Sequence, residues 1–146
     1  MNRPPLFTIG YEGRTLQEFL DALTGAGAEL LIDVRAIAAS RRPGFSKTAL
    51  SGAVREVGID YLHLRPLGTP KAGRDAARKG RTNEMRRIYE GQLATPEAQL
   101  ALLQAEAAAL ERPSALLCFE REASCCHRAI VAERLVAQSA FEVRNL

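Results

Sequence analysis

Short apolar runs alternate along the chain with longer segments in which apolar residues recur every three or four positions. The runs predict buried strands, and the spaced segments predict helices that cover them. Because strand and helix signals alternate, we expect a parallel sheet joined by crossover helices. The predicted strands are Leu6–Gly10, Glu29–Arg35, Ile59–Leu64 and Ala115–Glu120, with a short final strand at Phe141–Asn145.

Most predicted helices begin at residues that favour helix caps. Thr15 and Glu18 form a capping box before the first helix, which should end at Gly25 or Gly27. Later helices are predicted from the cap Ser46 to Gly58, from the cap Thr95 with Pro96 through Leu110, and through Ile130 to about Ser139.

Two segments have the composition of loops. Ala36–Ser46 contains Pro and Gly, and Pro66–Arg87 is polar and basic, with Gly and Pro at LGTPKAG. We predict that the second segment is a long loop that turns helical towards Tyr89. The resulting expectation for residues 1–146 is a single-domain, three-layer α/β fold with a small, mainly parallel sheet of four to five strands and helices on both faces.

Composition narrows the class of protein. The chain has 146 residues, of which 47% are apolar and 25% charged, and this suits one compact domain that needs no disulfide or metal for stability. We expect no cofactor. No apolar run is long enough to span a bilayer, and the first residues lack a signal-peptide pattern. We therefore expect a cytoplasmic protein with no membrane partner. A homo-oligomer is compatible with the sequence. The three cysteines, two of them adjacent, should be reduced thiols.

Polar residues stand where several predicted strands end, and parallel strands end at the same edge of a sheet. Asp33 and Arg35 alternate to the same side of the second strand, so they can form a charge-assisted pair or find other partners. Tyr11 follows the first strand, and His63 lies near the end of the third. These residues, with Cys118 and Glu120 on the fourth strand, form the predicted rim.

The densest chemistry lies in the strand–turn–helix segment LLCFEREASCCHR. Cys126 is the preferred candidate nucleophile, because a helix N-terminus with a nearby cation lowers a thiol pKa, and Cys118 is the rival. Both could instead be buried apolar side chains. His127 and Glu120 are candidate general acids or bases. We expect no tight zinc site, because consecutive Cys-Cys-His cannot all point inward from one helix.

Arginines near the predicted rim favour an anionic ligand. Guanidinium groups bind phosphate and carboxylate through paired hydrogen bonds, and Arg35, Arg41, Arg42 and Arg128 are the candidates. The net charge of +3 and the basic Pro66–Arg87 segment allow a nucleotide or a nucleic-acid backbone as partner.

Several motifs occur in an order that resembles one family over nearly the whole chain. They are TIGYEGRTLQEFL, LLIDVR, SRRPGFSK, YLHLRPLG and LLCFEREASCCHR followed by AIVAERL, and together they look like the domain of unknown function 488 family. The resemblance implies a compact α/β domain and brings no established activity. In this chain Tyr11-Glu12 stands where many relatives have His-Ser.

Two hypotheses of different classes follow. The first is an enzyme acting on a phosphorylated or nucleotide-like substrate, with arginines binding the anion and Cys126, His127 or Glu120 performing transfer or hydrolysis. The second is a non-catalytic module that binds nucleic acid or an anionic metabolite through the same arginines. The sequence leaves open which is correct.

Overall fold

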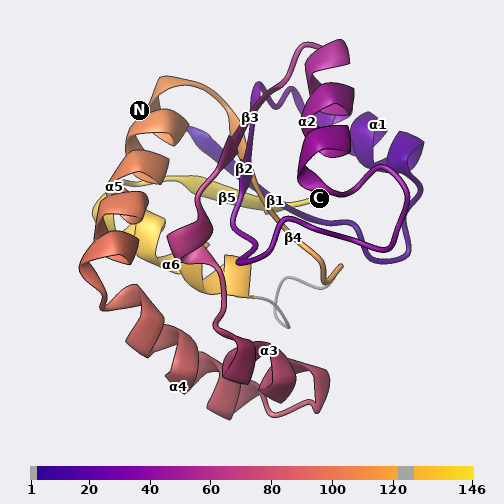
Figure 1. Cartoon of the computed structure of the whole chain (residues 1–146). Helices are drawn as coiled ribbons and strands as arrows, with labels where there is room; N and C mark the ends of the chain where they lie inside the picture. Colours follow the sequence, from indigo (N-terminus) through magenta and orange to yellow (C-terminus); the bar gives the residue numbers. More distant parts are fainter. Residues whose placement is uncertain (1–2, 122–126) are drawn as a thin grey trace.

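The computed structural model describes residues 3–121 and 127–146 and contains a five-stranded sheet in which every strand pair is parallel (Figure 1). The strand order is β3-β2-β4-β1-β5. The late strand β4 therefore lies between β1 and β2. The strands are β1 (Pro5–Gly10), β2 (Leu30–Asp33), β3 (Asp60–His63), β4 (Ser114–Cys118) and β5 (Glu142–Asn145). The predicted α/β fold is confirmed, including its final strand.

Helices cover both faces of the sheet, as alternation along the strands requires. On β2, Leu31 packs into the core under α1 and α2, while Leu30 and Ile32 pack into the core under α4, α5 and α6. Both cores are composed mainly of fully buried aliphatic and aromatic side chains. The helix bounds are α1 (Leu16–Ala26), α2 (Lys47–Glu56), α4 (Thr82–Leu93), α5 (Pro96–Glu111) and α6 (His127–Gln138).

The first helix begins and ends as its sequence predicts. The Thr15 hydroxyl accepts a hydrogen bond from the Glu18 N–H, and the Glu18 carboxylate accepts one from the Thr15 N–H. Gly27, with φ at 79°, ends the helix in the left-handed conformation that glycine adopts at low cost. At α2 the outcome differs, because Ser46 precedes the helix but its hydroxyl bonds the backbone of Ser40 instead.

The prediction of a long loop at Pro66–Arg87 is wrong. A short 3-10 helix, η1 (Arg65–Leu67), leads into α3 (Lys71–Arg78), and α4 follows after a brief turn. Pro70 sits at the N-cap of α3, where a missing N–H does no harm. Gly73 lies where a Cβ atom would be 2.5 Å from the Thr69 methyl group, so this glycine allows close packing.

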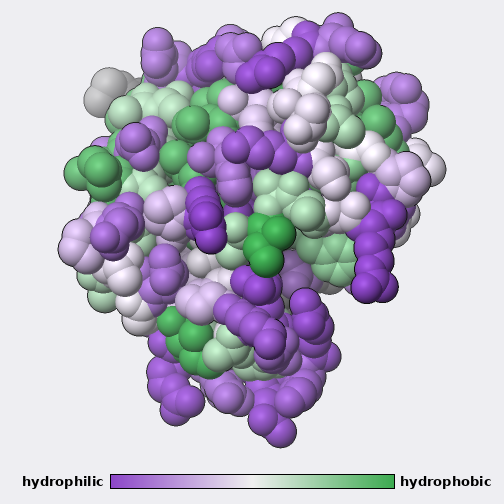
Figure 2. Space-filling model, viewed as in Figure 1, coloured by the Kyte–Doolittle hydropathy of each residue, from purple (hydrophilic) through white to green (hydrophobic). Residues whose placement is uncertain are grey.

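The pair formed by α3 and α4 extends from the edge of the layered body in Figure 1. Hydrophilic residues gather over this part of the molecule in Figure 2. Within the described ranges, no helix combines the length and apolarity that crossing a bilayer requires.

Gly10, the last residue of β1, is a position where a side chain has no room. A Cβ there would overlap the Glu120 carbonyl and lie 2.8 Å from Arg128 Nη1. We expect Gly10→Ala to lower the free energy of unfolding by about 1–3 kcal/mol, as overpacking does. Urea denaturation measures this. Gly25→Ala in α1 is the matched control, since nothing lies within 4 Å of its Cβ position, and an equal effect of both substitutions would contradict the prediction.

Candidate functional site

A cavity of about 680 Å³ opens at the carboxyl ends of β1, β2 and β4, which is the usual ligand position in a parallel α/β sheet. Its size falls in the range typical of small-molecule sites. Helix α3 and the start of α6 complete its walls. The polar and aromatic side chains that line it are Tyr11, Glu12, Arg35, Thr69, Arg74, Arg78, Phe119, Glu120 and His127, together with Cys118 and a few apolar residues.

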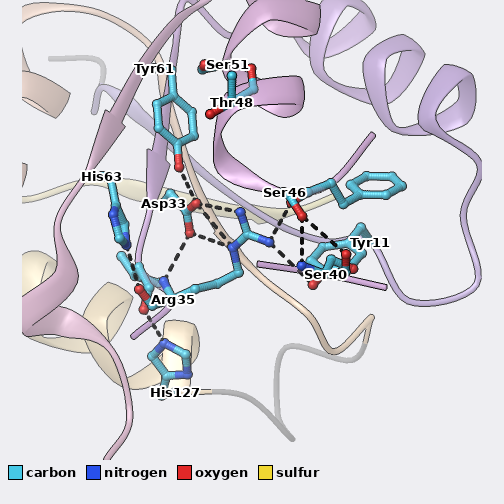
Figure 3. A network of polar contacts seen from close by, with 12 residues as sticks. Tyr11, Asp33, Arg35, Ser40, Ser46, Thr48, Ser51, Tyr61, His63 and His127 are labelled. Atoms are coloured by element: carbon cyan, nitrogen blue, oxygen red, sulfur yellow. Dashed lines mark hydrogen bonds and ion pairs between the residues drawn. The ribbon is translucent and has the colours of Figure 1, made fainter. Parts of the chain in front are cut away.

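A buried ion pair between Asp33 and Arg35 forms one wall. Arg35 Nε donates to Asp33 Oδ1 at 2.9 Å, and Nη2 donates to Oδ2 at 2.7 Å. Tyr61 donates to the same carboxylate at 2.5 Å from β3. Figure 3 shows these three side chains pointing toward one another. Asp33 is fully buried and Arg35 exposes only 6%, so each charge depends on the other for compensation.

The electrostatics of this pair follow from its burial. Burial alone would lower the pKa of Arg35, but the hydrogen bonds and charge of Asp33 outweigh it and raise that pKa. Burial, followed by the nearby Asp33 carboxylate, raises the pKa of Tyr61. Arg35 Nη1 also donates to the Phe45 carbonyl at 2.7 Å, which fixes the loop after β2. With its donors engaged in this way, Arg35 is held rigidly in the cavity wall.

Glu120 follows β4 and faces the cavity. Burial raises the pKa of its carboxyl group, while the charge of Arg128 partly opposes that shift. A carboxyl group with a raised pKa can carry a proton closer to neutral pH, as a general acid requires. The Cys118 sulfur lies 3.5 Å from Glu120 Oε2.

Cys118 is buried and disulfide-bonded. The prediction of reduced thiols is therefore wrong for this residue, and a thiolate role for Cys118 would require reduction first. The other two cysteines, Cys125 and the preferred nucleophile Cys126, lie outside the described residues. Among the described residues, Glu120 and His127 are the acid–base candidates that line the cavity.

His127 begins α6 and lines the cavity beside Tyr89, whose ring centroid is 5.1 Å away. Its Nε2 donates to the Val34 carbonyl at 2.7 Å, because a carbonyl can only accept. Burial lowers the pKa of His127 to about 4, the Val34 hydrogen bond opposing and the Arg128 charge reinforcing the shift. The ring is therefore neutral at pH 7.

Arg128, a predicted anion ligand, is completely buried and does not line the cavity. Its Nη1 donates to the Glu120 carbonyl and, at 3.1 Å, to the Cys118 sulfur. Its Nη2 donates to the Arg121 carbonyl at 2.8 Å. The space for this guanidinium exists because Gly10 has no side chain. Arg128 thus ties the start of α6 to the segment that follows β4.

The remaining predicted residues are dispersed around this centre. His63 is half-buried, and its Nε2 donates to the Arg35 carbonyl at 2.8 Å. Arg42 packs over the Phe45 ring, and Arg41 is exposed. Neither arginine lines the cavity, whereas Tyr11 does.

Sequence reasoning missed the cavity residues of α3. Arg74 and Arg78 stand one helical turn apart and both line the cavity. Arg74 Nη1 donates to the Thr69 carbonyl at 2.8 Å, while Arg78 is 74% exposed and pairs with Asp75 at 3.3 Å. Their spacing of four residues was the available signal, since it places two side chains on the same face of a helix.

The described residues contain no group of three His, Cys, Asp or Glu side chains arranged to hold a metal ion.

Comparison with known proteins gives one match. The family model described as Domain of unknown function DUF488 matches residues 15–135. No curated protein and no solved structure matches the chain.

Titration of His127 should make stability depend on pH. Its folded pKa of about 4 lies below the ordinary histidine value of 6.5, so the unfolded chain binds more protons between these values. The stabilisation is complete above pH 6.5 and is lost as the pH falls towards 4. We expect wild type to lose roughly 2 kcal/mol more than His127→Gln between pH 7 and 5 in urea denaturation. Parallel pH profiles for the two proteins would refute this account.

Removal of the Asp33 charge should destabilise the fold strongly. Asp33→Asn leaves the Arg35 guanidinium buried without its counter-charge, which costs about 3–5 kcal/mol. Tyr61→Phe removes a single hydrogen bond to the same carboxylate and should cost about 1 kcal/mol. Chemical denaturation of both variants measures the difference. A smaller loss for Asp33→Asn than for Tyr61→Phe would show that the ion pair is not the main constraint.

Proposed function

The chain belongs to the DUF488 family, a domain of unknown function, and we propose that it is an enzyme that binds a nucleotide-like anion in the cavity and uses Glu120 for proton transfer. One observation carries the proposal. A carboxyl group with a raised pKa shares the cavity with two arginines presented by α3.

Arg74 and Arg78 supply the anion-binding groups. The hydrogen bond from Arg74 to the Thr69 carbonyl uses one donor of its guanidinium and sets its orientation, and the remaining donors suit phosphate oxygens. The charge of Arg78 reaches Glu120, where it opposes the rise in pKa. An anion held by these arginines therefore lies within electrostatic reach of the carboxyl group.

Exposed apolar side chains at the cavity favour a ligand with a flat, apolar part. Ile37 and Phe119 line it while exposing 59% and 43% of their surfaces. The rings of Phe119 and Tyr11 form a T-shaped contact with their centroids 5.3 Å apart. This contact fixes the position of the Phe119 ring. A nucleotide base can stack on such surfaces while its phosphate reaches α3.

Glu120 can support the hydrolysis of a phosphoester. Protonated Glu120 donates its proton to the leaving oxygen as the bond from phosphorus to that oxygen breaks, and water forms the new bond to phosphorus. The carboxylate then accepts the proton that the attacking water releases, so Glu120 returns to its starting state. His127, neutral and bonded to the Val34 carbonyl, shapes the wall and does not supply the proton.

Substitutions at the cavity should affect ligand binding and hydrolysis separately. Arg74→Gln and Arg78→Gln should each weaken binding of adenosine monophosphate about tenfold, as measured by calorimetry, because each removes a charge-assisted contact. Glu120→Gln should keep that affinity while lowering hydrolysis of alkyl phosphate esters, whose leaving oxygen needs a proton, about a hundredfold or more. The exposed Arg144→Gln is the control for loss of charge. Unchanged hydrolysis by Glu120→Gln would rule out its role.

A non-catalytic nucleic-acid module is the second candidate. It is favoured by exposed basic residues on and between α3 and α4, namely Lys71, Arg78, Lys79, Arg81, Arg86 and Arg87. Binding through phosphates alone would weaken steeply with salt, with a slope set by the number of contacts. The double variant Lys79→Gln, Arg87→Gln should then reduce the slope by about 1.4, measured by fluorescence anisotropy with single-stranded DNA, while Glu120→Gln leaves binding unchanged.

A further inference from the structure

Three arginines meet at the turn between β1 and α1, beside the cavity. Arg14 precedes the N-cap of α1 and exposes only 9% of its surface. Its carbonyl accepts a hydrogen bond from Arg42 Nη2, which brings a second guanidinium to the turn. Arg121 is the third, with Nη1 3.8 Å from the Cβ position of Gly13. We call these residues the turn arginines.

One donor of the Arg14 side chain is unsatisfied. Its Nε is buried and has no hydrogen-bond partner among residues 3–121 and 127–146. Burial and then the charge of Arg121 lower its pKa, while Glu18 opposes the shift. An unsatisfied buried donor is costly, and natural proteins retain one where a ligand or another group completes it. An anion suits such a donor, because guanidinium groups form charge-assisted hydrogen bonds with phosphate and carboxylate oxygens.

The two carboxylates at this turn have other partners. Glu18 Oε1 accepts from the Thr15 N–H in the capping box, and Glu12 Oε1 accepts from the Arg121 N–H at 3.2 Å. Helix α1, which is 11 residues long, also points its N-terminus here, and the helix dipole favours negative charge at that end.

Two of the turn arginines follow cavity-lining residues on two neighbouring segments. Tyr11 and Glu12 line the cavity, and Arg14 follows two residues later; Phe119 and Glu120 line it, and Arg121 comes next. A hydrogen bond of 2.9 Å from the Glu12 N–H to the Phe119 carbonyl joins the segments. A ligand that extends from the cavity over this junction would reach the turn arginines.

We propose that the turn arginines bind a second phosphate of the same ligand, whose first phosphate is held by Arg74 and Arg78. This inference rests on the proposed function and narrows the substrate class to compounds with two separated phosphates, such as a dinucleotide or the end of a single-stranded oligonucleotide. Joining two anions in one molecule raises affinity, because the second contact becomes intramolecular.

The test compares deoxyadenosine monophosphate with the 5′-phosphorylated dinucleotide pdApdA by calorimetry at low salt. Wild type should bind pdApdA at least about tenfold more tightly. Arg14→Gln should remove this gain and leave binding of the mononucleotide unchanged. Arg121→Gln, at an exposed position, should reduce the gain without risk to the fold. The exposed Arg55→Gln on α2 is the charge control and should keep the gain.

Several outcomes would overturn the inference. One is equal affinity of wild type for the two nucleotides. Another is tighter binding of pdApdA that persists in both Arg14→Gln and Arg121→Gln. In an NMR titration with inorganic phosphate, the amide signals of Gly13 and Thr15 should shift in wild type and remain still in Arg14→Gln. Absence of the wild-type shift would also overturn it. The proposed function fails separately, if the mononucleotide does not bind or if Arg74→Gln binds it as wild type does.

Discussion

The buried pair of Asp33 and Arg35 is the interaction on which the rest of the site depends. Two charges held away from water are stable only with excellent geometry and further hydrogen bonds, and here both conditions are met. The pair orders the loop after β2 through the Phe45 carbonyl. The backbone of the same segment also positions two histidines. His127 donates to the Val34 carbonyl, and His63 donates to the Arg35 carbonyl.

The arginines of this chain fall into two groups, which differ in burial. Some bond groups of the fold, and others line the cavity. Arg35 and Arg128 are buried, and their donors bind carbonyls, a carboxylate and a sulfur that belong to the fold. Arg74 and Arg78 sit on a helix at the cavity and keep more contact with solvent. A buried guanidinium whose donors already bond groups of the protein is a poor ligand for a substrate. A guanidinium at a cavity wall can exchange bound water for phosphate.

Much of the fold could be predicted from local patterns. Alternation along the strands placed Asp33 and Arg35 on one side, and the capping box fixed the start of α1. The helices α3 and α4 could not be predicted so easily, because Gly73 and Pro70 have the local signature of a loop. Their helical role depends on tertiary packing against Thr69 and Ile88, which sequence spacing does not reveal.

The site was harder to predict than the fold for the same reason. A cation next to a strand-to-helix turn, such as Arg128, has the sequence signature of an anion ligand. Its burial follows from the space left by Gly10, a residue more than a hundred positions away in the chain. Local sequence indicates which chemical groups are present near the rim. Only the packed structure decides which of them face the cavity.

The position of β4 between β1 and β2 has a consequence for synthesis of the chain. These two early strands do not pair with each other, and each pairs with β4, whose first residue is Ser114. A ribosome must therefore release more than three quarters of the polypeptide before the sheet can close. Until then β1 and the β2–β3 pair expose edges that a neighbouring nascent chain could occupy, so closure of the sheet waits for the last quarter of the translated message.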